Sequence, residues 1–397
     1  MKQTTFASLA WDGKKRVTRR ERFLGEMDGV IPWTRIIGLI EPHYPKGESG
    51  RPPNPLAVML RIYFMQQWFN LSDPQAEDGL YDSESMRRFA GLELADDALP
   101  DETTICKFRH LLERHQLTGA IFEEVRGLLE ERRPLLKSGT IVDATLIAAP
   151  PSTKNQDRAR DPEMRQTRKG KQWHFGMKLH VGTDLQGLVH TLTATHAAVP
   201  DVNPMPELLH GQEKVVYGDR AYWRQQDRAL LEDLGVRYRV NRRGTRKNPL
   251  PEQWRLINRA RSRIRARGEH ALRVVKQLWG FTKVRYRGLA KNLARAYTMF
   301  ALANLYLMRR QLAQAGQVPA QLGIPGSQRA TPIKNRPSNS LRPTSVSCST
   351  ANSVANHSFP RERAKAEGAG LGRRRADLDA DSYFSRHGIR SALYVFW

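Results

Sequence analysis

Cysteine is almost absent from this sequence: its 397 residues include Cys106 and Cys348 and no other. Two cysteines cannot form a disulfide framework, and they cannot supply the ligands of a zinc site unaided. This count excludes the small disulfide-bonded secreted domains and the cysteine-rich zinc domains. We therefore expect a protein of a reducing, cytoplasmic compartment.

Long apolar runs are missing as well. The longest one, residues 297 to 308, is well short of the roughly 20 residues that a membrane-spanning helix needs. The N-terminal stretch MKQTTFASLAWDGKKR has no apolar segment long enough for a signal peptide. No basic amphipathic helix stands beside a lipid-anchor motif. We expect no association with a membrane.

Acidic residues are scarce relative to basic ones: 40 Asp and Glu face 65 Lys and Arg, a net charge of +25. The C-terminal end does not account for this excess, because residues from Gly316 onward hold 12 Lys and Arg and 5 Asp and Glu. A surplus of +18 remains in the part of the chain that the pattern predicts to be folded. Neutralising a polyanion releases its condensed counterions, so this charge favours a partner such as nucleic acid.

The first 135 residues or so have the pattern of a helical region. Pro55 precedes LAVMLRIYFMQQWF, which is apolar on nearly every side and predicts a buried helix. Basic residues on the last helix, Lys107 and Arg109, are compatible with a helix-turn-helix-like DNA reader, and equally with a plain helical bundle. The expected helices span residues 18–27, 33–40, 56–69, 72–81, 83–90 and 101–115.

After Gly139 the pattern changes to that of an α/β domain. TIVDATLI alternates and is β-branched, which predicts a strand. A hairpin with its turn at residues 184–187 follows, then further strands alternating with helices. This order matches an RNase H-like core, a mixed sheet flanked by helices. The expected strands span residues 140–147, 173–183, 188–196, 215–218 and 236–240, and the expected helices 223–234, 252–278 and 291–311.

These patterns predict three parts of the chain. Residues 1–135 form a helical N-terminal domain, and residues 136–312 form the α/β domain. Residues 313–397 form an extension, in which Pro, Ser, Thr and Asn dominate from 316 to about 358 and favour disorder.

Two aspartates stand out because they lie in or directly after apolar strands. Asp143 lies within IVDA, and Asp219 ends VVYGD. A carboxylate in such a place is costly unless something compensates it, and the simplest compensation is a hydrogen-bonded turn. Two such carboxylates about 4 Å apart would repel by roughly 4 kcal/mol at an effective dielectric of 20. A bound metal ion would remove this repulsion and explain both residues.

A third acid, Glu269, lies on the expected helix 252–278. At 100° per residue, Arg265, Glu269 and Lys276 fall within about 40° of one another, away from the apolar stripe of the helix. Glu269 would thus have a cation one turn before it and another two turns after it. An ordinary solvated ion-pair face explains the spacing of Arg265 and Glu269 equally well.

Basic clusters near these acids are candidates for contacts to a phosphate backbone. Trp173 or Trp223 is a candidate for stacking on an unpaired base, although packing explains such tryptophans as well. We assign Asp201 as the cap of a short helix and leave it out of the acid cluster. Histidines 174, 180, 190 and 196 are expected to be structural, because no Cys/His spacing supports zinc. The basic candidates are Lys154, Arg158, Arg168, Lys169, Lys171, Arg242 and Arg243.

Three motifs carry a resemblance to a known family. VDATLIAAP, YGDRAY and SRIRARGEHALRVVKQLWGF resemble InsH-type transposases of the insertion-sequence five family, which belong to the DDE class. The family's glutamate signature is Tyr-x2-Arg-x3-Glu-x6-Lys. Arg265, Glu269 and Lys276 match it, whereas Ser262 stands in the place of the tyrosine. The resemblance spans about residues 5 to 311.

The resemblance implies an enzyme that cleaves and joins DNA without a covalent intermediate. Asp143, Asp219 and Glu269 would bind two Mg²⁺ ions, for which Mn²⁺ can substitute, and Arg265 and Lys276 would face phosphate. Double-stranded DNA, both element ends and target, would be the partner, with the helical domain binding DNA. A homodimer in a synaptic complex and a location at the bacterial nucleoid are implied too.

Two other functions remain open from the residues. The chain could be a non-catalytic DNA-binding protein derived from a decayed element, because the extension beyond residue 312 is unlike the family. It could also be a nuclease on the same fold, which would cut DNA but never join it.

Overall fold

The computed structural model describes residues 11, 13–47, 52–94, 97–132, 138–154, 156 and 158–314. The disorder that we predicted for residues 316 to about 358 lies outside the described residues, as does Cys348. All of the described residues belong to one compact unit.

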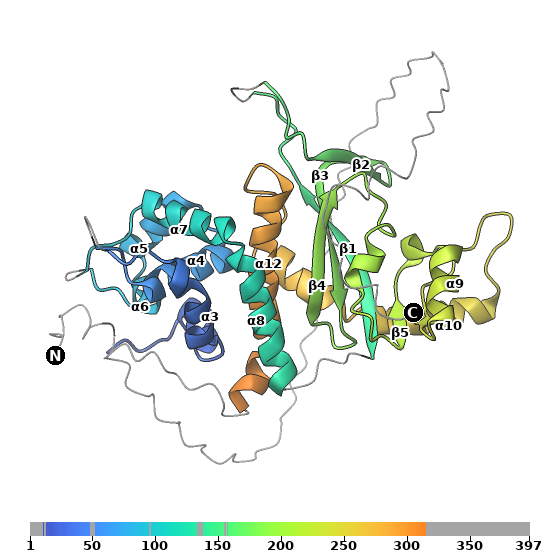
Figure 1. Cartoon of the computed structure of the whole chain (residues 1–397), viewed down its shortest axis with the longest axis horizontal. Coiled ribbons are helices and arrows are strands. Elements are labelled where there is room, and N and C mark those ends of the chain that lie inside the picture. The colour runs from blue at the N-terminus through green and yellow to red at the C-terminus, as the bar shows by residue number, and fades with distance from the viewer. Residues whose placement is uncertain are drawn as a thin grey trace, which may run out of the picture. The chain divides into compact units, whose positions relative to one another are not determined.

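The N-terminal region is helical, as predicted (Figure 1). Thr18 begins α2 with a reciprocal capping box, in which its hydroxyl accepts from the backbone of Glu21 and the Glu21 carboxylate accepts in return. Asn70 ends α4 in the left-handed conformation, at φ 53°. The elements are α2 (Arg19–Asp28), α3 (Trp33–Ile40), η1 (Glu41–His43), α4 (Leu56–Phe69), α5 (Asp73–Asp82), α6 (Glu84–Ala90), α7 (Glu102–Arg114) and α8 (Leu117–Arg132).

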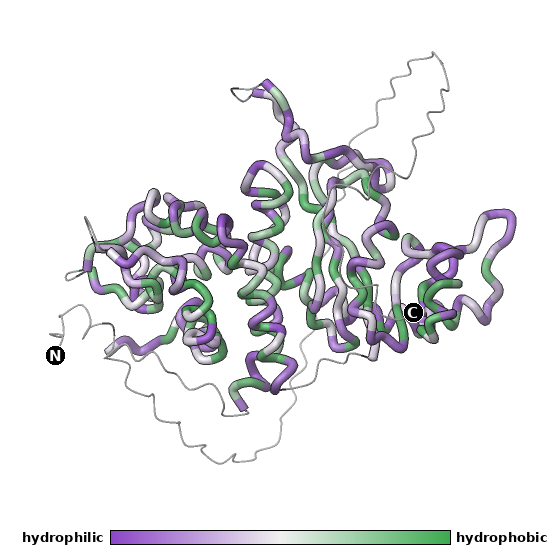
Figure 2. The backbone as a smooth tube through the Cα atoms, viewed as in Figure 1, coloured by the Kyte–Doolittle hydropathy of each residue, from purple (hydrophilic) through white to green (hydrophobic). Residues whose placement is uncertain are grey.

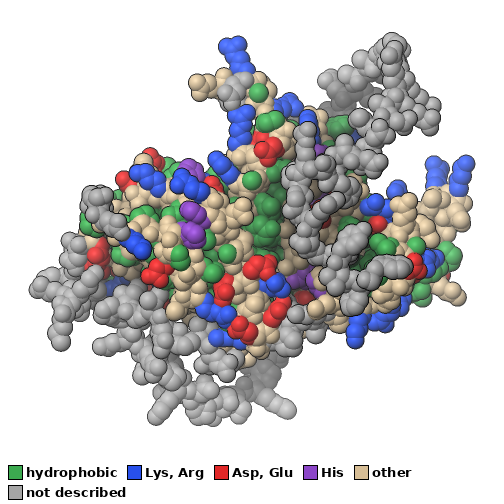
Figure 3. Space-filling model, viewed as in Figure 1, with side chains coloured by type: hydrophobic (Ala, Val, Ile, Leu, Met, Phe, Trp, Pro, Cys, Tyr) green, Lys and Arg blue, Asp and Glu red, His purple; other side chains and the backbone are tan. Residues whose placement is uncertain are grey.

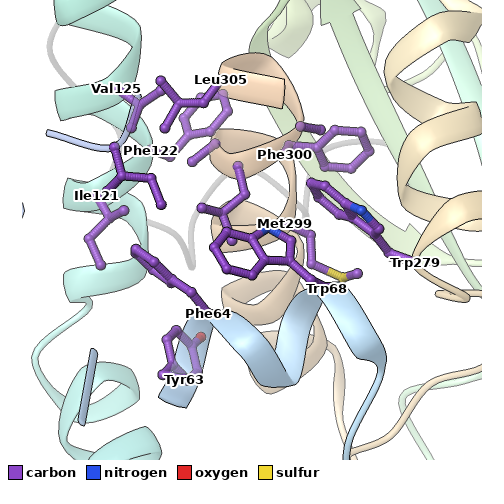
Figure 4. Close-up of a cluster of buried hydrophobic side chains, with 14 of the residues drawn as sticks. Tyr63, Phe64, Trp68, Ile121, Phe122, Val125, Trp279, Met299, Phe300 and Leu305 are labelled. Carbon is purple, nitrogen blue, oxygen red and sulfur yellow. The ribbon is translucent and has the colours of Figure 1, made fainter. Parts of the chain in front are cut away.

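The main hydrophobic core joins this helical region to the sheet. α12 (Leu289–Gln314) lies beside α8 and also contacts α2, α4 and β4. Phe64 and Trp68 of α4, Phe122 of α8 and Phe300 of α12 all belong to this buried cluster (Figure 4). Strand residues, Met177 among them, belong to the same buried cluster. None of the described helices combines the length and the hydrophobicity that crossing a membrane requires.

The sheet has the RNase H-like order that the sequence predicted. Three antiparallel strands run β4–β3–β1, and β5 and β6 continue parallel to β1. Figure 2 shows hydrophobic positions concentrated along these strands and the helices beside them. The strands are β1 (Gly139–Ala148), β2 (Arg165–Lys169), β3 (Gln172–Thr183), β4 (Val189–His196), β5 (Val215–Tyr217) and β6 (Arg237–Tyr238).

The basic segment 152–171, which lies between the first two expected strands and to which we assigned no strand, contains one, β2. β2 pairs antiparallel with the start of β3, from Arg165 opposite Gly176 to Lys169 opposite Gln172. Its side chains are mostly exposed, so the residues carry no apolar alternation from which the strand could have been predicted.

A second, smaller core lies under the other end of the sheet. Val142 and Val216 pack there with Tyr222, Leu231 and Tyr238. The elements that surround it are η2 (Met205–Leu208), η3 (Arg220–Tyr222) and α9 (Gln225–Asp233).

The helix that we predicted over residues 252–278 is interrupted, which corrects the geometry derived from it. It consists of α10 (Glu252–Arg265), α11 (Glu269–Arg273) and a π-helical turn, η4 (Val274–Leu278). The break lies where the chain passes against the β3–β4 turn, since the Arg267 guanidinium donates to the Leu185 carbonyl at 3.1 Å. Gly187, at φ 91°, approaches the Arg267 carbonyl so closely that a Cβ atom would overlap it.

Gly187→Ala tests this close approach. We expect the variant to lose about 1 to 3 kcal/mol of unfolding free energy, because the added methyl collides with the Arg267 carbonyl and its φ is unfavourable. Gly211→Ala is the matched control: Gly211 has φ 82° but open space around its Cβ position, so only the backbone cost applies. Urea unfolding of both variants measures the difference, and equal losses would contradict a steric role for Gly187.

Candidate active site

Asp143 lies in the middle of β1, opposite Val181 of β3. Because side chains alternate along a strand, it shares a face with Ile141 and Thr145. Its carboxylate accepts a hydrogen bond from the backbone of Ala144 at 2.9 Å. Burial raises the pKa of Asp143 to about 6. The negative charges of Asp219 and Glu269 also raise this pKa, whereas the positive charge of Arg265 lowers it. The three acids therefore act on one another electrostatically.

Asp219 reaches Asp143 through the parallel pairing of β1 and β5. Tyr217, the last residue of β5, is the partner of Ile141, so Asp219 and Asp143 each lie two residues beyond this pair. The Asp219 carboxylate also caps η3, because it accepts from the backbone of Ala221 at 2.8 Å. Asp219 therefore caps a turn and also belongs to the acid cluster, and its side chain is 42% exposed.

Glu269 is the first residue of α11 and is brought to β1 by the residue before it. A Cβ atom on Gly268 would lie 3.0 Å from the Ile141 side chain and 3.1 Å from the Thr183 hydroxyl, so the backbone packs directly on the sheet. The Arg265 guanidinium lies between two of the acids, 3.8 Å from Asp219 and 3.4 Å from Glu269.

Lys276 flanks the acids but does not pair with Glu269 in the way that a continuous helix would suggest. Its ammonium donates to the Thr145 hydroxyl at 2.9 Å and to the Leu146 carbonyl at 3.0 Å. Burial lowers its pKa, and so does Lys169. Thr145 is two residues beyond Asp143, so Lys276 lies about 7 Å along the strand from it.

Ser262 stands where the family's signature has a tyrosine. Its hydroxyl accepts from the Asn241 side chain at 3.0 Å, which ties α10 to the segment after β6.

The chemistry of the three acids suits a hard divalent cation, because carboxylate oxygens are the ligands that Mg²⁺ prefers. Across the described part of the chain, no three Asp, Glu, His or Cys side chains already stand together as a metal site. Arg265 instead provides the positive charge between Asp219 and Glu269. The donor set fits a metal, provided that Arg265 gives up this position.

The structure separates the predicted DNA contacts into exposed and buried residues. Figure 3 shows Lys and Arg gathered on the segment between β1 and β2 and over the loop between β6 and α10. Lys107 is exposed on α7, whereas Arg109 is 7% exposed and held by Asp73 and Glu113, which counts against a DNA contact. The exposed members are Lys154, Arg158, Arg168, Lys169, Lys171 and Arg243, and Arg242 is half-buried.

Asp201 is not the helix cap that we predicted. It pairs with Lys178 at 2.8 Å, and η2 begins later in the chain, after Pro204. Two of the histidines are buried, and burial lowers the pKa of His180 to about 4 and that of His190 to about 3. Neutral, buried imidazoles agree with the structural role expected for them.

Sequence reasoning missed Trp254 and Arg261, which line a pocket next to α10. Their spacing of seven residues, continued by four to Arg265, places them along one face of that helix. This spacing could have predicted from the sequence that Trp254 and Arg261 share a helix face with Arg265.

Asp143→Asn should stabilise the metal-free protein at neutral pH. The pKa of about 6 exceeds the roughly 3.9 of an unfolded chain, so folding is disfavoured as the pH rises through 6 and the carboxyl ionises. We expect the variant to gain about 1 to 3 kcal/mol at pH 7.5 and nothing at pH 4. Urea unfolding with a chelator at both pH values measures this, and a gain that does not depend on pH would contradict the burial of the charge.

Two family models match the chain. One, described as "Transposase domain (DUF772)", matches residues 12–111, and the other, "Transposase DDE domain", matches residues 134–305.

Solved structures of transposases are similar to this chain at low identity. A piggyBac transposase in a synaptic complex with hairpin DNA has 9% identity and a TM-score of 0.41, over 76% of this chain and 77% of that one. The Mos1 strand transfer complex has 13% identity and a TM-score of 0.22, over 68% and 81%. A pre-cleavage Mos1 transpososome has 14% and 0.21, over 67% and 80%.

The two family models follow each other along the chain as the helical region and the sheet do, and they agree with the family predicted from the motifs. The chain belongs to the DDE transposases, enzymes that act on DNA.

Proposed function

We propose that Asp143, Asp219 and Glu269 are the catalytic carboxylates with which this transposase cleaves and joins DNA at the ends of an insertion sequence. The observation that supports this most is their convergence from β1, from the end of β5 and from α11. Each of the other two acids raises the pKa of Asp143. Such mutual repulsion stabilises nothing in the fold, but it is relieved by a divalent cation.

Two Mg²⁺ ions, for which Mn²⁺ can substitute, complete the proposed site. Asp143, Asp219 and Glu269 would hold them. When bound, such ions activate an attacking oxygen and stabilise a leaving one. Their arrival would displace Arg265 from the two carboxylates that it now bridges.

The proposed reaction consists of two phosphoryl transfers at one place. A water oxygen first attacks the phosphorus at the element's end, and the bond from phosphorus to the 3′-oxygen breaks, which leaves a free 3′-hydroxyl. This hydroxyl then attacks a phosphorus of target DNA, and one phosphodiester replaces another. The enzyme carries no covalent intermediate, so its task is to position the strands and to balance the charge that develops.

Cations around the acids would hold the phosphates. Arg265, once released, offers a bidentate guanidinium, and Lys276 offers a point charge at the next position along β1. The exposed Lys and Arg residues between 154 and 171 and those of the loop after β6 would extend the contact along the backbone of double-stranded DNA. Lys107 would add a contact from the helical region.

A homodimer is the proposed assembly, because two element ends must be brought together before joining. The terminal inverted repeats would be its specific sites, with the nucleoid as its place of action. A nuclease that never joins, and a DNA-binding protein that never cuts, are the alternatives, and the first experiment below separates them.

Asp143→Asn and Glu269→Gln should each abolish cleavage and joining, by about a thousandfold or more, while DNA ends are still bound. The assay incubates the protein, Mg²⁺ and DNA with the element's ends and separates cut from joined product. Asp201→Asn is the matched control, since Asp201 pairs with Lys178 outside the proposed triad. Cleavage retained by Asp143→Asn would reject the site. Wild-type protein that binds without cutting, or cuts without joining, would select one of the alternatives.

Lys169→Ala and Lys171→Ala test the end of β2 and the turn that follows it. Both side chains are exposed, so the folded state should be unaffected, and equal melting temperatures provide the check. If each lysine contacts one phosphate, each variant lowers the slope of log K against log salt by about 0.9. Fluorescence anisotropy from 50 to 300 mM NaCl measures the slope, and an unchanged slope would place the DNA elsewhere.

A further inference from the structure

A pocket of about 310 Å³ lies between α9, β6 and the start of α10. Its volume falls at the lower end of the range of about 300 to 1,000 Å³ for small-ligand sites. Two tryptophans, a tyrosine and five arginines line it, together with Glu232, whose carboxylate is held by Arg228 at 3.0 Å. Flat rings and guanidinium groups together suit a ligand that has an aromatic face and negative charge.

Arg261 makes the strongest case for an anion. Its residue is only 9% exposed, and its guanidinium donates to the Val240 carbonyl at 2.7 Å. Burial lowers its pKa, and the nearby Arg239 and Arg242 lower it further. A buried cation surrounded by cations is costly without a counter-charge. A phosphate group would supply that charge.

The aromatic rings define the rest of the pocket. The Arg242 guanidinium lies 3.5 Å from the centre of the Trp254 ring and 5.7 Å from that of Trp223. Trp223 in turn packs on Tyr238, with ring centres 5.6 Å apart. The flat guanidinium thus covers a Trp face as a stacked base would, and both tryptophans remain partly accessible.

The pocket is next to the acids along the same helix. Arg261 and Arg265 are four residues apart on α10, which is one turn or about 6 Å. Trp254 lies about 16 Å before Arg265 at 1.5 Å per residue. A strand whose phosphate reaches Arg265 can therefore present a neighbouring nucleotide to the pocket.

We propose that this pocket binds an unpaired nucleotide of the DNA substrate, with its base taking the place of the Arg242 guanidinium on Trp254 and its phosphate held by Arg261 and the displaced Arg242. A DNA ligand follows from the enzyme's family, so the inference does not rest on the metal triad. A paired base would stay within the duplex stack and could not use the rings, whereas phosphate contacts alone would need no tryptophan.

The test measures binding by the full chain in a chelator, so that no chemistry occurs. The probes are an oligothymidylate of about eight nucleotides and a fully paired duplex, each followed by fluorescence anisotropy. Trp254→Ala and Arg261→Gln should weaken oligothymidylate binding about tenfold or more, with duplex binding changed less than twofold. Trp254→Phe keeps an aromatic face and should retain most of the affinity. Tyr81→Ala, at an exposed aromatic residue of α5, is the control for the loss of an aromatic side chain.

Each other outcome contradicts the proposal. If both variants weaken the two probes equally, the pocket contacts the duplex backbone only, and if neither is weakened it binds no DNA. If free dTMP displaces the labelled oligothymidylate as effectively as the unlabelled oligonucleotide does, the pocket binds a free nucleotide. Trp254→Ala, at a half-exposed residue, carries the test alone if Arg261→Gln fails to fold. Asp143→Asn should bind both probes as the wild type does. An error in the proposed catalytic triad can therefore be distinguished from an error in the proposed nucleotide pocket.

Discussion

The close packing of residues 266–268 on the sheet fixes most of what surrounds the acids. Gly268 lies against β1 and Gly187 against the Arg267 carbonyl, so the chain passes over the strand that carries Asp143 with no room for side chains between them. This contact ends α10 at Arg265 and begins α11 at Glu269. Both the bridge that Arg265 makes and the place of Glu269 follow from it. The pocket on α10 depends on it as well, because the same helix carries Arg261.

Local pattern was enough to predict the order of elements and to single out Asp143 and Asp219, but not the contacts between distant segments, and Glu269 was assigned by the resemblance to the family. Apolar alternation predicted β1, β3 and β4, and the matching strand order placed Asp143 beside the end of β5. The interruption of the helix 252–278 could not be predicted, because its cause is a turn some eighty residues earlier in the chain. β2 was missed because its exposed side chains do not alternate. Arg109 was predicted to contact DNA because it is a basic residue on a helix. The local sequence does not show that it is buried and paired with Asp73 and Glu113.

Arg265 gives the acid cluster two arrangements of charge. Without metal, its guanidinium neutralises Asp219 and Glu269 in part, while Asp143 is left with a raised pKa. In the proposed metal-bound arrangement the cations take over that neutralisation, and Arg265 becomes available to an incoming phosphate. Arg265 would then couple metal binding to DNA binding, because metal binding releases the guanidinium that contacts the DNA phosphate.

The core shared by the helices and the sheet has a consequence for how such proteins diversify. α12 follows the sheet in the chain, yet it packs on α2, α4 and α8, which precede it. Buried polar contacts reinforce the joint, because Arg295 of α12 bonds to Gln67 and Asn70 at the end of α4. If gene fusion replaced the N-terminal helices with an unrelated segment, the face of α12 that packs on them would be exposed to solvent. New DNA specificities are therefore expected to arise by substitution on exposed faces more readily than by swapping whole segments.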